Sequence, residues 1–497
     1  MLFNSIEFFI FFFVVTTTYF LIPHKYRYLL LLFSSCYFYM AFVPIYILIL
    51  GFTIVIDYFA GILIEKAEGK RRKQYLIVSL ISNILVLAVF KYYNFFNENI
   101  TQLMLSLGYT NPIPYLSILL PIGLSFHTFQ AMSYTIEVYR GNQPAVRNFG
   151  IYALYVMFYP QLVAGPIERP QNLLHQFVEK HNFDYKRVTS GLKLMVWGLF
   201  KKVVIADRLS LFVDQVYDHP TNYQGLSLIV ATVFFTFQIY CDFSGYSDMA
   251  LGAAEVMGFK LMQNFKRPYF SKTISEFWKR WHISLSTWFK DYVYIPLGGN
   301  RGIKWRWYFN LFIVFLLSGF WHGANWTFVI WGALHGFYLI FAIVTKPARD
   351  KLNSVMGLNK FPRFYSLIQI IITFVLVSFA WIFFRANSLN DAFYISSNLF
   401  TGLGESISGI LNGFAQSGQG KNVFSQVFLG QLIEDFIIAI LAIAFMEFVH
   451  YKQRNNSLRE LISTKPFYLR WTGYYAIVLA ILFLGVYGQR QFIYFQF

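Results

Sequence analysis

The sequence predicts an all-α protein that crosses a membrane many times. Hydrophobic residues make up 57% of the 497 residues, aromatic residues 21% and charged residues only 13%. Soluble domains carry about 25% charged residues, so this chain has too little polar surface to cover its apolar side chains in water. The same composition excludes disordered, collagen-like and disulfide-rich classes, and we expect one integral-membrane domain over residues 1–497.

The length of the apolar runs supports this fold class. A helix needs about 20 apolar residues to cross the hydrocarbon of a bilayer. Runs near that length predict ten to twelve crossings in all. They lie at 5–22, 28–43, 46–64, 75–90, 115–136, 191–205, 226–257, 308–344, 366–384, 436–449 and 471–487.

The charge of the chain fits the same interpretation. The net charge of +17 comes from 41 Lys and Arg against 24 Asp and Glu. In membrane proteins Lys and Arg gather in cytoplasmic loops, so this excess indicates topology and we expect no nucleic-acid partner. The alternation of basic clusters places the N-terminus and residues 492–497 outside. Cys36 and Cys241 lie in apolar runs and are expected to be small buried hydrophobes.

The longest polar break, 260–306, contains ten Lys and Arg. Its aromatic stretches, such as 277–281 and 285–289, are too short to span a membrane. Two interpretations stay open. The segment is either an amphipathic cytoplasmic loop on anionic lipid or a re-entrant element that lines a cavity.

A histidine stands inside the 37-residue apolar run 308–344, which is too long for one crossing. We expect a break near its middle, at Gly319-Phe-Trp-His322-Gly-Ala-Asn325. The two glycines there allow close approach of neighbouring helices. His322 is either a hydrogen-bonding contact between helices or a catalytic base reached by water, and neutral imidazole suits a base near pH 7. Trp321 and Asn325 are candidate donors to an oxyanion.

A second histidine, His282, lies within the polar break. It is either a catalytic residue at a re-entrant element or an interfacial histidine among aromatic side chains. Three nearby cations would attract the phosphates of a cytoplasmic carrier, or equally anionic lipid. These cations are Lys279, Arg280 and Lys290.

Two carboxylates, Asp242 and Asp248, are embedded in the apolar run 226–257. Six residues correspond to about 600° of helix, so on a continuous helix they point to different faces and form no acid–base pair. A helix break at Gly245 would change the directions in which the two carboxylates point. The alternative to a functional role is a structural one, in which the carboxylates hydrogen-bond to backbone groups or to an Arg. His127 is expected to make an interhelical contact. The sequence has no zinc-ligand spacing and no nucleotide-binding loop, so we predict no metal site and no bound cofactor.

Several segments together resemble the membrane-bound O-acyltransferases, most closely the bacterial alginate O-acetyltransferase branch, which is similar to the teichoic-acid D-alanyl transferase. The matching segments cover most of a core at 121–385, in family order. They are 121–126, 158–167, 242–249, 279–300, 319–323 and 381–385, and they include Asp242-Phe-Ser-Gly-Tyr-Ser, Lys279-Arg-Trp-His282 and Gly319-Phe-Trp-His322-Gly.

The resemblance implies a fold and a reaction. The fold would be a ring of about 10–12 membrane helices with re-entrant segments around a thinned centre and a tunnel. His322 would be the essential histidine and His282 the second family histidine, on the cytoplasmic side. The expected tunnel-lining or supporting residues are Trp321, Asn325, Asp242 and Asp248. The donor would be acetyl-CoA or another acyl thioester, such as one on an acyl-carrier protein. The acceptor would be a hydroxyl of a cell-envelope polysaccharide, reached through an extracytoplasmic partner acetyltransferase from the bacterial inner membrane.

The C-terminal residues 492–497 resemble the aromatic C-terminal motif of this branch. That resemblance implies that Tyr494 carries the acyl group as an ester on the outer side. The alternative is an aromatic anchor at the membrane interface.

Other functions stay open at this point. D-alanylation of teichoic acid would use a small carrier protein as donor. A polysaccharide or lipid transporter would line its path with the intramembrane His and Asp residues. A non-enzymatic export scaffold would not need the proton chemistry of His322.

Overall fold

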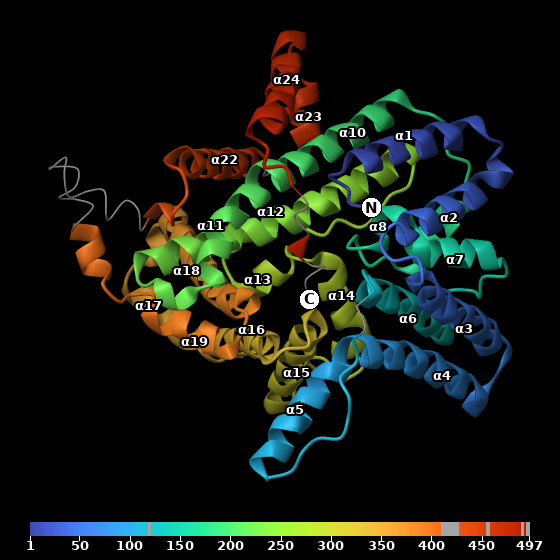
Figure 1. Ribbon diagram of the computed structural model, residues 1–497, viewed down its shortest axis with the longest axis horizontal. Coiled ribbons are helices and arrows are strands. Elements are labelled where there is room, and N and C mark those ends of the chain that lie inside the picture. The colour runs from blue at the N-terminus through green and yellow to red at the C-terminus, as the bar shows by residue number, and fades with distance from the viewer. Residues whose placement is uncertain (118–120, 409–426, 454–457, 489–491, 494–497) are drawn as a thin grey trace. The chain divides into compact units, whose positions relative to one another are not determined.

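The computed structural model describes residues 1–117, 121–408, 427–453, 458–488 and 492–493, and every regular element among them is a helix. This confirms the all-α class. The described chain forms two compact units (Figure 1). The first contains Met1–Gly198 and Tyr246–Gln263, and the second contains Leu199–Gly245 and Asn264–Ile493. The expectation of one integral domain over residues 1–497 stays a prediction.

The first unit is built on α3, α4 and α6, which pack side by side (Figure 1). A polar cluster lies between α3 and α4, where the buried carboxylate of Asp57 accepts hydrogen bonds from Ser79 Oγ at 2.6 Å and Asn83 Nδ2 at 2.8 Å. The helices of this unit are α1 Ile6–Leu21, α2 His24–Met40, α3 Tyr46–Lys66, α4 Gly69–Leu87, α5 Tyr93–Ser106, α6 Leu124–Arg140, α7 Phe149–Met157, α8 Tyr159–Leu162, α9 Pro170–Leu173 and most of α10 Tyr185–Phe200.

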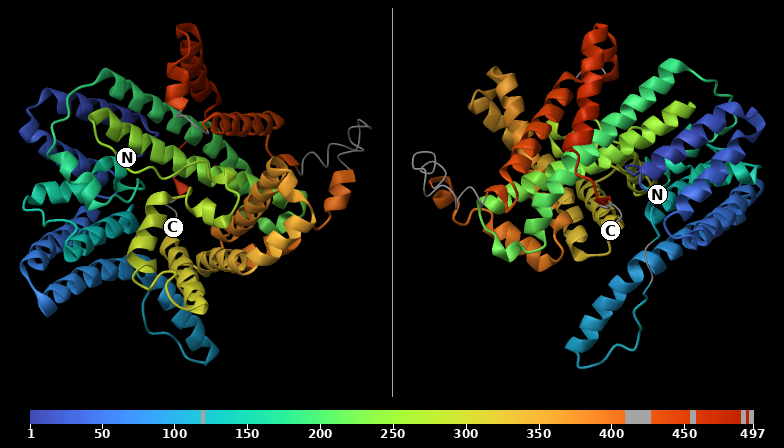
Figure 2. Two further views of the ribbon diagram at one scale, coloured as in Figure 1. Left: turned by 180° about the vertical axis from the view of Figure 1, so that it is seen from behind. Right: turned by 45° about the horizontal axis from the view of Figure 1, so that its top comes forward.

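The second unit is centred on α15 and α16, an antiparallel pair that the left view of Figure 2 shows in yellow to gold. A π-helix, Lys201–Ala206, leads from α10 into α11. The helices are α11 Asp207–Tyr217, the first part of α12 Leu226–Met257, α13 Ile274–Trp278, α14 Ile283–Phe289, α15 Lys304–His322, α16 Trp326–Val344, α17 Lys346–Val355, α18 Pro362–Arg385, α19 Leu389–Asn398, α22 Ile433–Lys452, α23 Leu458–Ser463 and α24 Phe467–Leu484.

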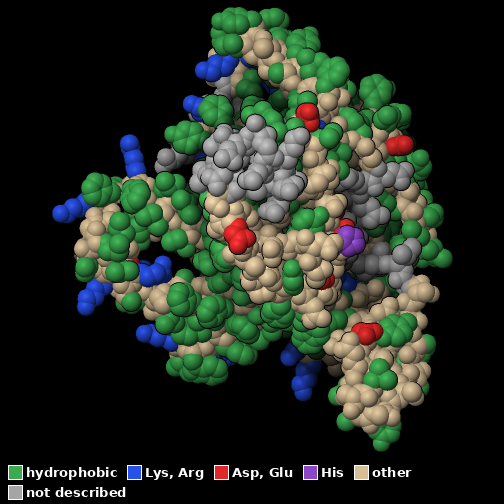
Figure 3. Space-filling view, turned by 60° about the vertical axis from the view of Figure 1, so that its left-hand side comes forward, with side chains coloured by type: hydrophobic (Ala, Val, Ile, Leu, Met, Phe, Trp, Pro, Cys, Tyr) green, Lys and Arg blue, Asp and Glu red, His purple; other side chains and the backbone are tan. Residues whose placement is uncertain are grey.

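Six helices among the described residues are long and apolar enough to cross a membrane. They are Tyr46–Lys66, Gly69–Ser106, Leu226–Met257, Trp326–Val344, Pro362–Arg385 and Phe467–Leu484. Large hydrophobic side chains lie on their surfaces, and Figure 3 shows such side chains over much of the face in view. Such exposed apolar surface fits lipid contact. These features confirm a multi-pass membrane protein, while ten to twelve crossings, the ring and the tunnel stay predictions.

The structure differs from the sequence-based elements in two places. The apolar run 115–136 begins its helix only at Leu124, because Pro121 and Gly123, whose φ is 76°, precede it in a turn. The polar break 260–306 forms short helices, α13 and α14, and a π-helical turn at Lys290–Tyr294, in agreement with stretches too short to span.

Glu168 is fully buried in the first unit, where its carboxylate accepts a hydrogen bond from the backbone N–H of Met262. Burial raises the pKa of Glu168 from 4.5 to about 7. Between these values the folded protein holds more protons on this group than the unfolded chain does. Stability is therefore lost as the pH rises through this window, by roughly 3 kcal/mol in total.

We therefore expect Glu168→Gln, which stays neutral, to flatten the fall in thermal stability between pH 5 and pH 8. Melting of the detergent-purified protein at both pH values measures this, with the exposed Glu179→Gln as the matched control. Equal pH dependence in wild type and Glu168→Gln would contradict the assignment.

Candidate active site

The candidate site lies in the second unit, where α15 ends. His322 is the last residue of α15, and Gly323–Asn325 separates it from α16, so the predicted break is confirmed. The side chain of Asn325 accepts a hydrogen bond from the N–H of Thr327 at 3.0 Å and caps α16. This capping fixes where α16 starts, directly after the turn that follows the histidine.

Glycines set the separation of α15 and α16. A Cβ atom on Gly319 would lie 2.3 Å from the carbonyl oxygen of Phe328, and one on Gly332 would lie 2.3 Å from that of Phe315. Real side chains do not approach so closely, so the two backbones are in direct contact at this crossing, as is typical of small residues between membrane helices. The crossing lies one turn before His322 and fixes its position.

We expect Gly319→Val to force α15 and α16 apart and to lower stability by about 1–3 kcal/mol, with a loss of activity because His322 moves. Gly473→Ala is the control, because a Cβ atom on that glycine of α24 would meet no atom within 4 Å. Thermal melting and enzymatic rate would be measured for both variants. A Gly319→Val protein as stable and active as Gly473→Ala would contradict the close crossing.

His282 occupies the N-cap position of α14 in a left-handed backbone conformation, with φ 45° and ψ 55°. This conformation is strained for a residue with a Cβ atom, and such strain gathers at functional sites. Asn264 holds the backbone that follows: its carbonyl accepts from the N–H of Ile283 at 3.0 Å, and its Oδ1 accepts from Ser284 Oγ at 2.7 Å. Asn264 is fully buried, so this support is fixed.

The structure brings His282 and His322 together. Their ring centroids are 6.5 Å apart, and the side chains are 0% and 4% exposed. His282 lies outside the six membrane-length helices, and burial lowers its pKa to about 3, so this imidazole is neutral at neutral pH. A neutral imidazole can accept a proton from a hydroxyl group.

Aromatic rings surround this pair. The ring centroid of Trp321 lies 4.9 Å from that of His322 and 6.3 Å from that of His282. The structure therefore brings together these three residues, which the sequence had singled out. Sequence reasoning missed three further rings. They are Trp331 at 5.0 Å and Phe384 at 5.4 Å from His322, and Phe243 at 4.7 Å from His282.

A third histidine, also missed, lies behind Trp331. The centroid of the fully buried His335 is 5.0 Å from that of Trp331, and Trp278 Nε1 donates to His335 Nδ1 at 3.2 Å. The accepting Nδ1 places the proton of a neutral ring on Nε2. The signal was available, because His335 stands in the same apolar run as His322.

Asp242 and Asp248 do not act as a pair. α12 continues through Gly245 without a break, so the two side chains point to different faces, as expected. Only Asp242 belongs to the unit that holds the histidines. Its carboxylate pairs with Lys202 Nζ at 2.6 Å, and Lys202 also contacts Asp207 at 2.9 Å.

The three predicted phosphate-binding cations differ in their surroundings. Lys279 and Lys290 are exposed, whereas Arg280 pairs with Glu276 at 2.5 Å. Binding of a donor phosphate by this group stays a prediction, and the oxyanion roles of Trp321 and Asn325 stay predictions too. Tyr494 lies outside the described residues.

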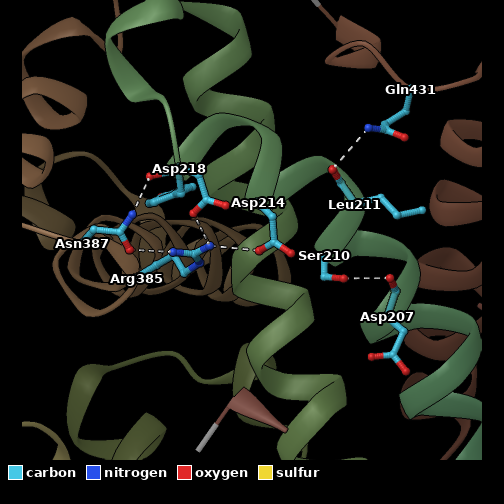
Figure 4. Close-up of polar contacts among 9 residues, drawn as sticks. Asp207, Ser210, Leu211, Asp214, Asp218, Arg385, Asn387 and Gln431 are labelled. Carbon is cyan, nitrogen blue, oxygen red and sulfur yellow. Dashed lines mark hydrogen bonds and ion pairs between the residues drawn. The ribbon is translucent and has the colours of Figure 1, made fainter. Parts of the chain in front are cut away.

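An arginine clamp holds the end of α18 against α11 (Figure 4). The guanidinium of Arg385 donates to Asp214 at 2.9 Å and to Asp218 at 3.3 Å, and both carboxylates point toward it. Asn387 adds a bond to the carbonyl of Tyr217 at 3.3 Å. The clamp directly follows Phe384, whose ring contacts His322.

Residues 146–388 match the MBOAT family, the membrane-bound O-acyltransferase family. The chain is 40% identical over 405 residues to the "Probable alginate O-acetylase AlgI" of Pseudomonas aeruginosa, which covers 81% of this chain and 75% of that protein. It is 37% identical over 389 residues to the peptidoglycan O-acetyltransferase of Helicobacter pylori, covering 73% and 71%.

A more distant relative is the teichoic acid D-alanyltransferase of Bacillus subtilis, 26% identical over 281 residues, which cover 53% of this chain and 68% of that protein. The matched region contains both histidines and the rings around them. The chain therefore belongs to the membrane-bound O-acyltransferase family and is an O-acyltransferase.

Proposed function

We propose that the protein transfers an acetyl group from a cytoplasmic acyl thioester to hydroxyl groups of an exported cell-envelope polysaccharide. The observation that carries this proposal is the buried pair His282 and His322, 6.5 Å apart in an aromatic enclosure. Relatives named for O-acetylation of alginate and of peptidoglycan support acetyl as the group and a glycan as the acceptor.

In the proposed reaction His322 accepts the proton of the acceptor hydroxyl. The oxygen then attacks the carbonyl carbon of the thioester, a C–O bond forms, and the C–S bond breaks. The thiol leaves with a proton that an imidazole returns. Trp321 and Asn325 are the proposed donors to the oxyanion, and the low polarity of the enclosure strengthens such hydrogen bonds.

The proposed donor and acceptor lie on opposite sides of the membrane, so the acyl group must cross the bilayer. A thioester such as acetyl-CoA does not cross a bilayer, and the exposed Lys279 and Lys290 are available to attract its phosphates. We propose that a ring of helices with a thinned centre and a tunnel lets the acyl group cross about 30 Å of hydrocarbon. An extracytoplasmic partner acetyltransferase would complete the transfer at the bacterial inner membrane, with Tyr494 as the proposed acyl carrier.

Ester analysis of cells tests the function. Deleting the gene should remove O-acetyl esters from the exported polysaccharide, and the wild-type gene should restore them. Wall-linked alanine esters would be measured in the same cultures. Loss of alanine esters with unchanged acetyl esters would instead establish D-alanyl transfer, and no change in either would leave a transporter or scaffold.

Inverted membrane vesicles test the direction of transfer. Acetyl-CoA labelled in the acetyl group would be added to the cytoplasmic face, which is outside in such vesicles, with the polysaccharide enclosed. Label should reach the enclosed polymer. Label that appears only with donor enclosed would overturn the proposed sidedness.

A further inference from the structure

Phe492 and Ile493, which follow α24 in the chain, are held in the second unit by a hydrogen bond from the main chain. Phe492 and Ile493 are 2% and 7% exposed, and the N–H of Ile493 donates to Asp242 Oδ2 at 2.7 Å. Asp242 lies 251 positions earlier in the chain. A carboxylate acceptor makes such a bond stronger than a bond between neutral groups.

The acceptor itself is held in place. Asp242 Oδ1 pairs with Lys202 Nζ at 2.6 Å, and the same ammonium group contacts Asp207 Oδ1 at 2.9 Å. Side chains of all three residues are at least nine-tenths buried. We call these three residues the ion triad. Because Lys202 uses Oδ1, the other oxygen of Asp242 is oriented toward the N–H of Ile493.

The elements that supply the ion triad also bind residues at the end of α24 and just after it. The N–H of Val486 donates to the carbonyl of Val203 at 2.9 Å, next to Lys202. Arg208, next to Asp207, donates to the carbonyl of Leu484 at 2.6 Å. Leu484, Val486 and Ile493 are therefore all bound by one region, so the contact at Ile493 is not isolated.

A short path of rings connects Phe492 to the histidines. The centroid of Phe492 is 6.0 Å from that of Phe243, and the centroid of Phe243 is 4.7 Å from that of His282. Phe243 directly follows Asp242 on α12. One turn of α12 thus carries both the acceptor that binds Ile493 and the ring that contacts His282.

We infer that the ion triad is an internal docking site for Phe492 and Ile493, and that Asp242 acts as a positioning residue for His282 through Phe492 and Phe243. This assigns Asp242 a role in acyl transfer without contact with the substrate, and that part rests on the proposed function. The partner recognised by the triad is the backbone N–H of Ile493, which proline would lack.

Cysteine labelling tests the docking without any use of activity. Ile493→Cys keeps the N–H donor, and Cys36→Ser and Cys241→Ser remove both native thiols, so that labelling reports position 493 alone. Adding Asp242→Asn or Lys202→Met should raise the rate of maleimide labelling at position 493 by at least about tenfold, because Phe492 and the residue at 493 undock more often. Lys201→Met is the matched control, because it removes a neighbouring buried cation that donates to Ser244 at 2.8 Å. Labelling that does not change, or that rises equally in the control, would overturn the docking site.

A backbone variant tests the positioning role and avoids disturbing the buried charges. Ile493→Pro removes the donor, whereas Ile493→Ala keeps it and loses only the side chain. We expect Ile493→Pro to lower kcat about tenfold more than Ile493→Ala, with an unchanged KM for the thioester. Equal kinetics of the two variants would overturn the positioning role. If the proposed acyl transfer itself fails, wild type shows no rate, and the labelling result still decides the docking.

Discussion

His322→Gln is expected to lower the rate of acyl transfer by about 10²–10⁴-fold, which is the usual contribution of a positioned general base. Glutamine keeps a hydrogen-bonding side chain of similar reach but cannot take a proton at neutral pH. The measurement is the initial rate of thiol release from an acyl thioester in the presence of a polysaccharide acceptor, with purified protein at matched concentration. His322 is 4% exposed, so the melting temperature of each variant must be compared as well.

His175→Gln is the matched control, because its side chain is 55% exposed and belongs to the first unit. It should keep the wild-type rate. A His322→Gln protein that melts like wild type and turns over at the wild-type rate would show that His322 is a packing contact between α15 and α16. In that event the ring contacts at 5.0 Å to Trp331 and 5.4 Å to Phe384 would be its role.

The break between α15 and α16 was predictable because it depends on residues that are close together in the sequence. A 37-residue apolar run exceeds one crossing, and Gly319, Gly323 and Asn325 mark where it can stop. The different faces of Asp242 and Asp248 were predictable for a similar reason, since helical periodicity alone separates them. Both features follow from residues near one another in the sequence, for which span length and helical periodicity give direct predictions.

The support of His282 could not be predicted in this way. The left-handed backbone conformation of His282 could not be predicted from the sequence, because glycine is the residue that usually indicates that conformation and this position is a histidine. Asn264, which binds the following backbone, is a common polar residue in a loop, and its role appears only once Ile283 and Ser284 lie against it. The family resemblance named both histidines, but their proximity was not predicted, since it depends on how separate helices pack.

The ion triad shows the same limit for charges. Lys202 lies in an apolar run near several other basic residues, and the sequence alone assigns it to a cytoplasmic cluster. Its partners Asp207 and Asp242 come from different elements, so only tertiary packing pairs them. Asp242 was a candidate supporting residue of the tunnel, and sequence spacing contains no sign of its bond to Ile493, which lies 251 positions away.

Lys202→Met is expected to be strongly destabilising. It removes one buried ammonium group and leaves the two buried carboxylates of Asp207 and Asp242 without their shared cation. Removing one partner of a buried ion pair costs about 3–5 kcal/mol, because the remaining charge stays desolvated. The measurement is thermal or denaturant unfolding in detergent, with Lys201→Met, of equal size and charge change, as control.

The double variant Lys202→Met/Asp242→Asn separates charge from packing. If the uncompensated carboxylate causes the loss, neutralising Asp242 as well should recover part of the stability, because one fewer buried charge is left unpaired. If shape causes the loss, the double variant should be less stable than Lys202→Met alone. Asp242 has two roles, pairing with Lys202 and binding the N–H of Ile493. The double variant separates them if stability recovers while position 493 stays accessible to maleimide. We expect that accessibility because an asparagine oxygen that Lys202 no longer orients binds the N–H of Ile493 less tightly.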